Sequence, residues 1–301
     1  MIKISSVILN YNGGKDTLEC LSSLISQTGK NFNHELIVVD NASSDSSVEL
    51  IEKKYPQIQV IKNKTNLGYA QGNNIGILKA LTNGADYVFI LNNDTKSDSK
   101  CLQHLLNFSL THKTAGIISP KIYFYPGFET HTELYKNTDI GKILWYAGGK
   151  IDWNNMLVSH RGIDEVDKGQ YDEAQKTPFI SGCAMFIKRE VLESVGLFDS
   201  KLFLYFEDLD LCQRAKKKGY EAWYIPQAVI WHKNANSSGG SGSKLQVYYQ
   251  TRNRMFIGMR YASLRTKFAL FKEAGKVIFT GNEIQKKGVI DFLRNNYGQK
   301  N

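Results

Sequence analysis

Short apolar runs alternate with helix-like stretches over the first 114 residues, and this alternation constrains the fold more than any other feature. The runs at 4–9, 35–39 and 87–91 each stop abruptly at Asn or Asp, and residues with helical spacing follow each stop. Strands that alternate with helices predict an α/β fold: a Rossmann-like, mainly parallel sheet with helices on both faces. The loops after the strands then share one edge of the sheet, where open α/β sheets bind ligands.

Residues 115–188 have a different pattern, with short β-like pieces separated by polar loops. We therefore expect an α+β second half that covers the sheet edge. Aromatic residues then lead into Glu207 and Asp208, and helical periodicity continues from there to Gly219. These two carboxylates are expected at a helix N-terminus, where the helix dipole favours the ionised form. The alternative is that both are ordinary charges of a first helical turn.

The positive charge of the chain is concentrated at its C-terminal end. The net charge is +9, and the segment 244–301 holds 12 Lys and Arg against 3 Asp and Glu, so residues 1–243 are neutral overall. This segment is also aromatic and has helical spacing. We expect it to be attracted to an anionic partner, which could be a lipid surface, a phosphate-bearing substrate or nucleic acid.

Composition indicates a cytoplasmic protein. With 301 residues, 42% of them hydrophobic, the chain can bury a large core. No apolar run approaches the roughly 18 residues that span a bilayer, and the chain enters a strand pattern at once, without a signal-peptide pattern. The four cysteines are far apart in sequence and are expected to be reduced core thiols, which argues against a zinc site.

The polar residues at the strand ends suggest phosphate chemistry. Asp94 ends a buried run, and hard cations such as Mn²⁺ or Mg²⁺ need only one or two carboxylates when a diphosphate supplies further oxygens. Asp40, with Asn10 and Asn12, could bind a base and ribose, and Gly68 could let backbone N–H groups approach phosphate or sugar oxygens. The alternative for these residues is turn and cap formation.

Seven blocks of sequence, in order, resemble family 2 glycosyltransferases of the GT-A fold, close to the rhamnosyltransferase-like branch. The blocks are VILNYN at 7–12, VVDNASSD at 38–45, NLGYAQGNNIG at 66–76, LNND at 91–94, ISGCA at 180–184, FEDLDLCQR at 206–214 and WHK at 231–233. The resemblance spans about residues 4 to 260, and it implies the roles that follow.

By this resemblance, Asp208 is the catalytic base with Glu207 beside it, and Asp94 and His232 lie at a divalent cation, Mn²⁺ or Mg²⁺. Asn92 occupies the first acidic position of the DxD motif, so we expect poor metal affinity without nucleotide. Arg252 and Arg254 are expected to face phosphates or the acceptor. The residues expected to bind the nucleotide sugar are Asn10, Tyr11, Asn12, Asp40, Asn41, Gly68, Asn74, Asn92, Asn93, Ser181 and Gly182.

The implied enzyme is an inverting glycosyltransferase. It would move a sugar, with rhamnose as a candidate, from a nucleotide-diphosphate sugar to a hydroxyl of a growing cell-surface glycan on a lipid-linked acceptor. We expect a catalytic domain at 1–235, divided into a nucleotide-binding half at 1–114 and an acceptor and catalytic half at 115–235. A flexible Gly/Ser loop at 236–243 and the basic extension at 244–301 follow, and the extension would attach the cytoplasmic protein to an anionic membrane on its inner face.

Two other functions are alternatives to this one. A nucleotidyltransferase would need a basic, glycine-rich first loop, whereas the loop at 10–14 has only Lys15 nearby. A nucleic-acid-binding module would use the basic extension but would leave Asp94 and Asp208 without a role, so we expect no nucleic-acid partner.

Overall fold

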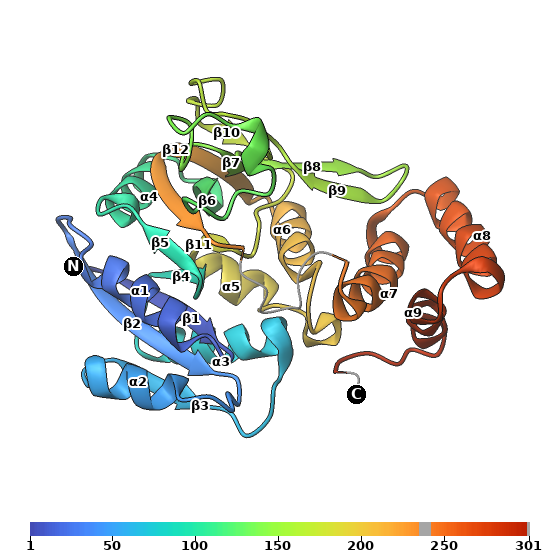
Figure 1. Cartoon of the computed structure of the whole chain (residues 1–301), viewed down its shortest axis with the longest axis horizontal. Coiled ribbons are helices and arrows are strands. Elements are labelled where there is room, and N and C mark those ends of the chain that lie inside the picture. Colours follow the sequence, from blue (N-terminus) through green and yellow to red (C-terminus); the bar gives the residue numbers. More distant parts are fainter. Residues whose placement is uncertain (235–241, 300–301) are drawn as a thin grey trace.

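The computed structural model describes residues 1–234 and 242–299, and a mixed β-sheet forms its centre (Figure 1). Within these residues the strands follow the order β10-β12-β6-β11-β4-β1-β2-β3, with β5 on β12 and β7 on β6, while β8 and β9 form a separate hairpin. The α/β class predicted from the sequence is confirmed. The strands are β1 Ile2–Asn10, β2 Phe32–Asp40, β3 Gln59–Lys62, β4 Tyr87–Asn92, β5 Thr95–Ser97, β6 Ala115–Phe124, β7 Leu144–Tyr146, β8 Gly149–Asp152, β9 Leu157–His160, β10 Gln175–Lys176, β11 Ala184–Lys188 and β12 Glu221–His232.

The first four strands form the parallel half of the sheet. β1 lies between β2 and β4, and β3 pairs with the outer side of β2, all in parallel. The register pairs Asn10 with Asp40 and Leu9 with Asn92. The polar strand ends therefore meet at one edge, as expected from the alternation of strands and helices.

The second half of the chain extends the same sheet instead of forming a separate layer. β11 runs antiparallel between β4 and β6, and β12 runs parallel to β6. β12 is one long strand with a register shift between Ile225 and Val229. Pro226 lies in this interruption, where a residue without an N–H is tolerated.

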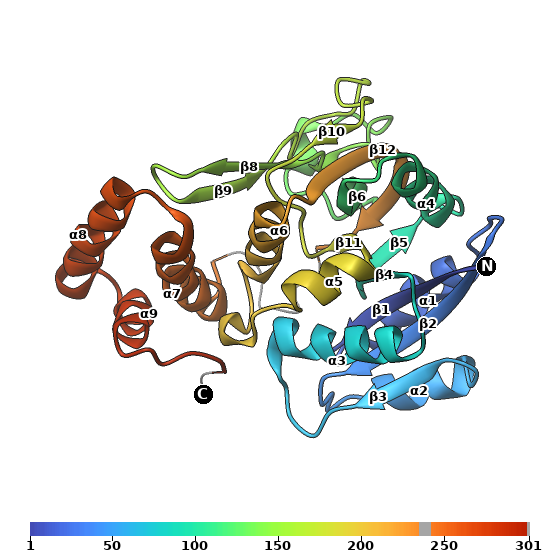
Figure 2. The same ribbon diagram turned by 180° about the vertical axis from the view of Figure 1, so that it is seen from behind.

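Helices cover both faces of the sheet because successive strand residues point to opposite sides. On β4, Val88 and Ile90 belong to the apolar cluster that includes residues of α3, α5 and α6, whereas Phe89 and Leu91 belong to the cluster that includes residues of α1, α2 and α4. Figure 2 shows α3 and α5 over one of these faces. The helices are α1 Gly14–Ile25, α2 Ser47–Lys54, α3 Gly68–Thr82, α4 Cys101–Thr111, α5 Arg189–Val195, α6 Glu207–Lys217, α7 Lys244–Tyr261, α8 Leu264–Thr280 and α9 Glu283–Leu293.

The C-terminal extension is helical, as predicted, and forms one end of the molecule (Figure 1). The aromatic and basic run is broken between α7 and α8, where Ser263 caps α8 by accepting a hydrogen bond from the Thr266 N–H. Among the helices at 1–234 and 242–299, none has the length and hydropathy needed to cross a membrane. The predicted Gly/Ser loop at 236–243 falls largely on residues 235–241, which lie outside the described residues.

The four cysteines are buried, and none forms a disulfide. Burial raises the pKa of the Cys20 thiol to about 12 and also raises that of Cys183. These side chains are core thiols, as the spacing predicts.

Candidate active site

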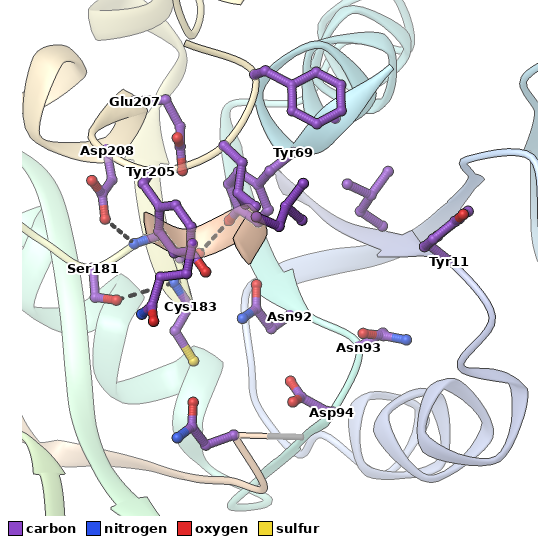
Figure 3. Close-up of a pocket in the computed structure, with 18 of the residues that line it drawn as sticks. Tyr11, Tyr69, Asn92, Asn93, Asp94, Ser181, Cys183, Tyr205, Glu207 and Asp208 are labelled. Carbon is purple, nitrogen blue, oxygen red and sulfur yellow. Dashed lines mark hydrogen bonds between the residues drawn. The ribbon is translucent and has the colours of Figure 1, made fainter. Parts of the chain in front are cut away.

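A pocket of about 540 Å³ opens at the edge of the sheet where the parallel strands end (Figure 3). Residues from Leu9 to Gln250 line this pocket, and the last of them belong to α7. Asn92 and Asn93 lie at its centre, with Asp94 on one side and Glu207 and Asp208 on the other. The lining residues are Leu9, Tyr11, Asn41, Asn66, Gly68, Tyr69, Asn92, Asn93, Asp94, Trp145, His160, Ser181, Gly182, Cys183, Phe203, Leu204, Tyr205, Glu207, Asp208, His232, Asn234, Leu245, Gln246 and Gln250.

Asp94 and His232 form a buried pair at the pocket wall. Asp94 follows β4, His232 ends β12, and β5 pairs with β12 so that the two side chains meet. His232 Nε2 lies 3.1 Å from Asp94 Oδ1. Burial opposes a charge on the imidazole, but the neighbouring Asp94 carboxylate outweighs it and raises the pKa of His232 well above its usual value.

The Asp94–His232 pair is suitable as part of a metal site but not as a complete one. A carboxylate oxygen and an imidazole nitrogen are both ligands for Mn²⁺ or Mg²⁺. Across the described ranges, no group of three or more His, Cys, Asp and Glu side chains could hold a metal ion. A cation at this pair would therefore need further ligands from a bound molecule, and a diphosphate supplies such oxygens.

Asp208 is held at the first turn of α6, as predicted. The Gly182 N–H donates to Asp208 Oδ2 at 2.8 Å, and the Leu209 N–H donates to Oδ1 at 2.7 Å. Tyr69 supports this contact from the other side, since its hydroxyl donates to the Gly182 carbonyl at 2.5 Å (Figure 3). One carboxylate of the second half is thus fixed against the loop that precedes β11.

The environment of the two carboxylates differs from the sequence expectation. The helix dipole was expected to favour their ionised forms. Burial instead raises the pKa of Asp208, despite its two backbone hydrogen bonds, and raises that of Glu207 well above its usual value with help from the Asp208 charge. Within the described residues, Glu207 Oε2 is buried without a hydrogen-bond partner. Desolvation exceeds the dipole here because the dipole contributes only about 1 kcal/mol or less.

The loop before α6 has an unusual backbone. Phe203, Tyr205 and Phe206 have φ values of 61°, 70° and 73°, a region that residues other than glycine rarely adopt. Asn253 of α7 holds this loop: its Nδ2 group donates to the carbonyls of Leu202, Leu204 and Tyr205 at 2.8, 2.8 and 2.9 Å. No local sequence pattern indicates this contact, because Asn253 and the loop are about 50 residues apart in the chain.

Arg252 and Arg254 do not reach the pocket, so the expectation that they face phosphates is wrong in this structure. Arg252 is fully buried and donates to the carbonyls of Lys201, Leu202 and Gly298. Arg254 pairs with Glu273 at 2.6 Å and donates to the carbonyls of residues 155 and 156. Both side chains leave α7 on sides that face other parts of the protein.

Several residues that were expected to bind the nucleotide do not line the pocket and instead form hydrogen bonds to other residues behind its wall. Asn10 Nδ2 donates to Asp40 Oδ1 at 2.8 Å, and Ser43 donates to both Asp40 oxygens, so Asp40 is buried beside the pocket and does not line it. Asn12 Oδ1 accepts a hydrogen bond from the Ser44 N–H, in the loop after β2. Asp94 and Asp208 therefore line one pocket, whereas Asp40 lies behind its wall.

Asn74 is also placed differently from the expectation. Its side chain donates to the Phe198 carbonyl at 2.9 Å and accepts from the Phe198 N–H at 3.0 Å, and it does not line the pocket. The remaining donor-site residues (Tyr11, Asn41, Gly68, Asn92, Asn93, Ser181 and Gly182) do line it.

Other pocket residues were missed by sequence reasoning. Trp145 packs edge-on against His232, with ring centroids 4.6 Å apart, and His160 packs against Trp145. Both come from irregular β-like pieces of the second half, where no local pattern indicates a site. Tyr69 lies in a block already noted for its resemblance, so its position could have been suspected.

Comparisons with known proteins identify the family of the chain. Residues 5–196 match the family model for Glycosyl transferase family 2. The chain is 24% identical over 269 residues to an N-acetylglucosaminyl-diphospho-decaprenol L-rhamnosyltransferase of Mycobacterium tuberculosis, covering 85% of this chain and 84% of that one. It is 25% identical over 254 residues to a low-salt glycan biosynthesis hexosyltransferase of Haloferax volcanii, covering 83% of this chain and 74% of that protein.

Solved structures share the fold. GalNAc-T7, solved with UDP, GalNAc and Mn²⁺, aligns with a TM-score of 0.68 at 18% identity over 98% of this chain, which spans 55% of that protein. A mannosyltransferase of Pyrobaculum calidifontis, solved with GDP-Man and Mn²⁺, aligns with a TM-score of 0.54 at 15% identity over 95% of this chain and 73% of that one. The family match covers well over half of the chain, and the sheet is that of a GT-A fold. The chain therefore belongs to glycosyl transferase family 2 and is a glycosyltransferase.

Proposed function

We propose that this glycosyltransferase moves a sugar from a nucleotide-diphosphate sugar to a hydroxyl of a growing cell-surface glycan, with inversion at the anomeric carbon. The observation that carries the proposal is the pocket itself, which Asp208 lines on one side and Asp94, paired with His232, lines on another (Figure 3). A base for the acceptor and a binding place for the diphosphate are thus available on opposite sides of one cavity. Family membership leaves no support for a nucleotidyltransferase or a nucleic-acid-binding module.

The donor would lie along the ends of β1 and β4. Tyr11 and Asn41 border the pocket on the β1 side, where Asn10, Asn12 and Asp40 fix the loops that would enclose the base and ribose. The diphosphate would extend toward Asp94 and His232, which together with its oxygens would hold Mn²⁺ or Mg²⁺. A bound cation neutralises the diphosphate and so makes it a better leaving group.

Asp208 would accept the proton of the acceptor hydroxyl as the oxygen attacks the anomeric carbon. The new bond forms from the acceptor oxygen to that carbon while the bond from the carbon to the diphosphate oxygen breaks, so the sugar inverts and the nucleoside diphosphate leaves. The Gly182 and Leu209 N–H groups orient the carboxylate for this step. Its raised pKa makes Asp208 a better proton acceptor than an ordinary aspartate.

The acceptor is proposed to be lipid-linked, with rhamnose as a candidate for the transferred sugar. The support is the Mycobacterium relative, whose name describes rhamnosyl transfer to N-acetylglucosaminyl-diphospho-decaprenol. The proposed division is a catalytic domain at 1–235 and a basic extension at 244–301 that meets the inner face of a membrane. The extension is not a detached appendage, because Leu245, Gln246 and Gln250 of α7 line the pocket.

A thermal-shift panel of UDP-, dTDP- and GDP-sugars, with and without Mn²⁺, tests the donor. A ligand at 100 times its Kd should stabilise the fold by about 2.7 kcal/mol. We expect one nucleotide class to raise the melting temperature, and to do so more strongly with the cation. NMR of the product formed from that donor should then show an inverted anomeric centre, and retention of configuration would overturn the mechanism.

A further inference from the structure

Helix α8 presents large apolar side chains to solvent. Leu264, Phe268 and Phe279 are 84%, 74% and 83% exposed, and Phe271 is 47% exposed. Soluble proteins rarely have several exposed Phe and Leu side chains on one helix. The core-facing side of the same helix is occupied by other residues, since Leu270 and Ala274 are buried.

These exposed side chains form one stripe. At 3.6 residues per turn, positions 264, 268, 271 and 279 fall within an arc of about 80°. Gly275 lies in the same arc, and no atom would come within 4 Å of a Cβ built there. The outer stripe of α8, as we call residues 264, 268, 271, 275 and 279, therefore points away from the rest of the protein. Figures 1 and 2 show α8 at the outer end of the molecule.

Basic side chains flank the outer stripe on both sides. Lys267 lies on one side, and Lys272, Arg265 and Lys276 lie on the other, by the same helical spacing. The acidic residues of the segment are engaged elsewhere: Glu273 pairs with Arg254, Glu283 pairs with Lys286, and Asp291 accepts a hydrogen bond from Tyr248. An apolar stripe flanked by Lys and Arg is the pattern of a helix that lies in the interface of an anionic membrane.

We propose that the outer stripe of α8 docks the enzyme on an anionic lipid bilayer by inserting Phe268, Phe271 and Phe279 at the headgroup boundary. This inference deepens the proposed function, because it rests on an acceptor that is itself lipid-linked. A second copy of the chain fits the stripe less well, since two such faces would bring their basic rows together and repel. The negative surface of a bilayer instead complements them.

The position of α8 also suits the site. Its predecessor α7 lines the pocket with Leu245, Gln246 and Gln250 near its start and leads directly into α8 at its end. At 1.5 Å per residue, the 18 residues of α7 span about 27 Å. Docking through α8 would therefore hold the pocket within tens of ångströms of the lipid surface from which the acceptor projects.

Vesicle binding of the full-length protein tests this proposal. We expect co-sedimentation with phosphatidylglycerol-containing vesicles, much weaker binding to phosphatidylcholine alone, and weaker binding when salt is raised from about 0.1 M to about 1 M, which shortens the Debye length from about 10 Å to about 3 Å. The double variant Phe268→Ser/Phe279→Ser should lose at least tenfold in partition coefficient with an unchanged melting temperature, because both side chains are already exposed.

The matched control is Leu78→Ser/Leu134→Ser, which removes two exposed apolar side chains outside the C-terminal helices. It should bind vesicles like the wild type. Equal loss in both double variants, or no wild-type binding to anionic vesicles, would overturn the proposal. So would a dimer that the Phe variant dissociates without any change in lipid binding.

The same variants separate this proposal from the proposed function. Transfer to a short water-soluble acceptor should be unchanged in Phe268→Ser/Phe279→Ser, while transfer to acceptor embedded in anionic vesicles should fall. If the wild type binds vesicles but transfers no sugar from any nucleotide donor, the proposed function fails and the docking surface stands. If transfer to the embedded acceptor is unchanged in the variant, the docking surface fails and the proposed function stands.

Discussion

At the scale of single residues, the assignment that matters most is Asp208 as base. Asp208→Asn keeps the shape of the side chain but removes the proton acceptor. A positioned base typically contributes 10²–10⁴-fold, so we expect kcat to fall by about that factor while nucleotide binding, measured by titration, is retained. Asp172→Asn, which alters a carboxylate that is 62% exposed, should leave turnover near the wild-type value. Near wild-type turnover in Asp208→Asn would refute the assignment.

Gly68 is a residue whose conformation and surroundings both require glycine. Its φ is +76°, and an added Cβ would lie 2.4 Å from the Phe203 ring. Gly84 provides a matched control, with a φ of +83° but no atom within 4 Å of the added Cβ. We expect Gly84→Ala to lose about 1 kcal/mol of unfolding free energy. Gly68→Ala should lose clearly more and also weaken donor binding, as measured by denaturant titration and thermal shift. Equal losses of unfolding free energy in the two variants would show that the Phe203 ring moves aside without cost.

His34 should make stability depend on pH. Burial lowers the pKa of His34 to about 4, and its Nε2 lies 2.8 Å from Ser6 Oγ. The unfolded chain takes up this proton near pH 6.5 but the folded chain only near pH 4, so stability is complete above pH 6.5 and falls as pH drops toward 4. The loss is up to about 3 kcal/mol. Denaturant titrations should show a shallower fall for His34→Gln, in which the similar shift in the pKa of His160 remains. An identical pH dependence would contradict this account.

At the scale of elements, α7 holds the loop that leads into α6, whose first turn carries Glu207 and the proposed base Asp208. Asn253→Ala removes the donor to the carbonyls of residues 202, 204 and 205 and the acceptor for Arg252 Nε. The 202 carbonyl keeps its bond from Arg252, whereas the 204 and 205 carbonyls lose this donor in a partly buried place. Each unsatisfied buried group costs about 1–3 kcal/mol, so we expect a loss of stability and a larger fall in kcat than in nucleotide affinity. Thr251→Ala on the same helix removes only the bond to the Val247 carbonyl and should behave like the wild type. A fall in nucleotide affinity without a fall in kcat would argue that Asn253 does not position the first turn of α6 for catalysis.

The sheet elements follow from the sequence more directly than α7 does. The parallel strands β1, β2 and β4 and their polar ends were predictable, because alternating apolar runs and turn residues are local signals. β11 was seen as a β-like run, yet its antiparallel insertion between β4 and β6 depends on pairing across more than 60 residues. Local sequence patterns do not determine which strands pair with each other in the sheet.

At the scale of the whole molecule, the C-terminal segment is part of the catalytic body. Asp291 accepts a hydrogen bond from Tyr248 at 2.7 Å, and Gly298 bonds to Arg252 and Lys201 through its carbonyl and N–H groups. Ending the chain at residue 260 should therefore lower the melting temperature and abolish transfer even to a water-soluble acceptor. Tyr248→Phe, which removes one hydrogen bond, should cost only about 1 kcal/mol. A truncated chain that melts and turns over like the wild type would contradict this packing.

The sequence alone determined the α/β class, the family resemblance, and the placement of Asp94 and Asp208 at element ends, because these depend on periodicity and on residues that stop strands or start helices. Only the tertiary structure decided that Asp40 and Asn74 support the site from behind. The tertiary structure also shows that Arg252 points inward to the carbonyls of residues 201 and 202, and that Trp145 packs against His232. The physical reason is that a side chain's partners are chosen by packing between distant segments, and burial there outweighs preferences such as the helix dipole at Asp208.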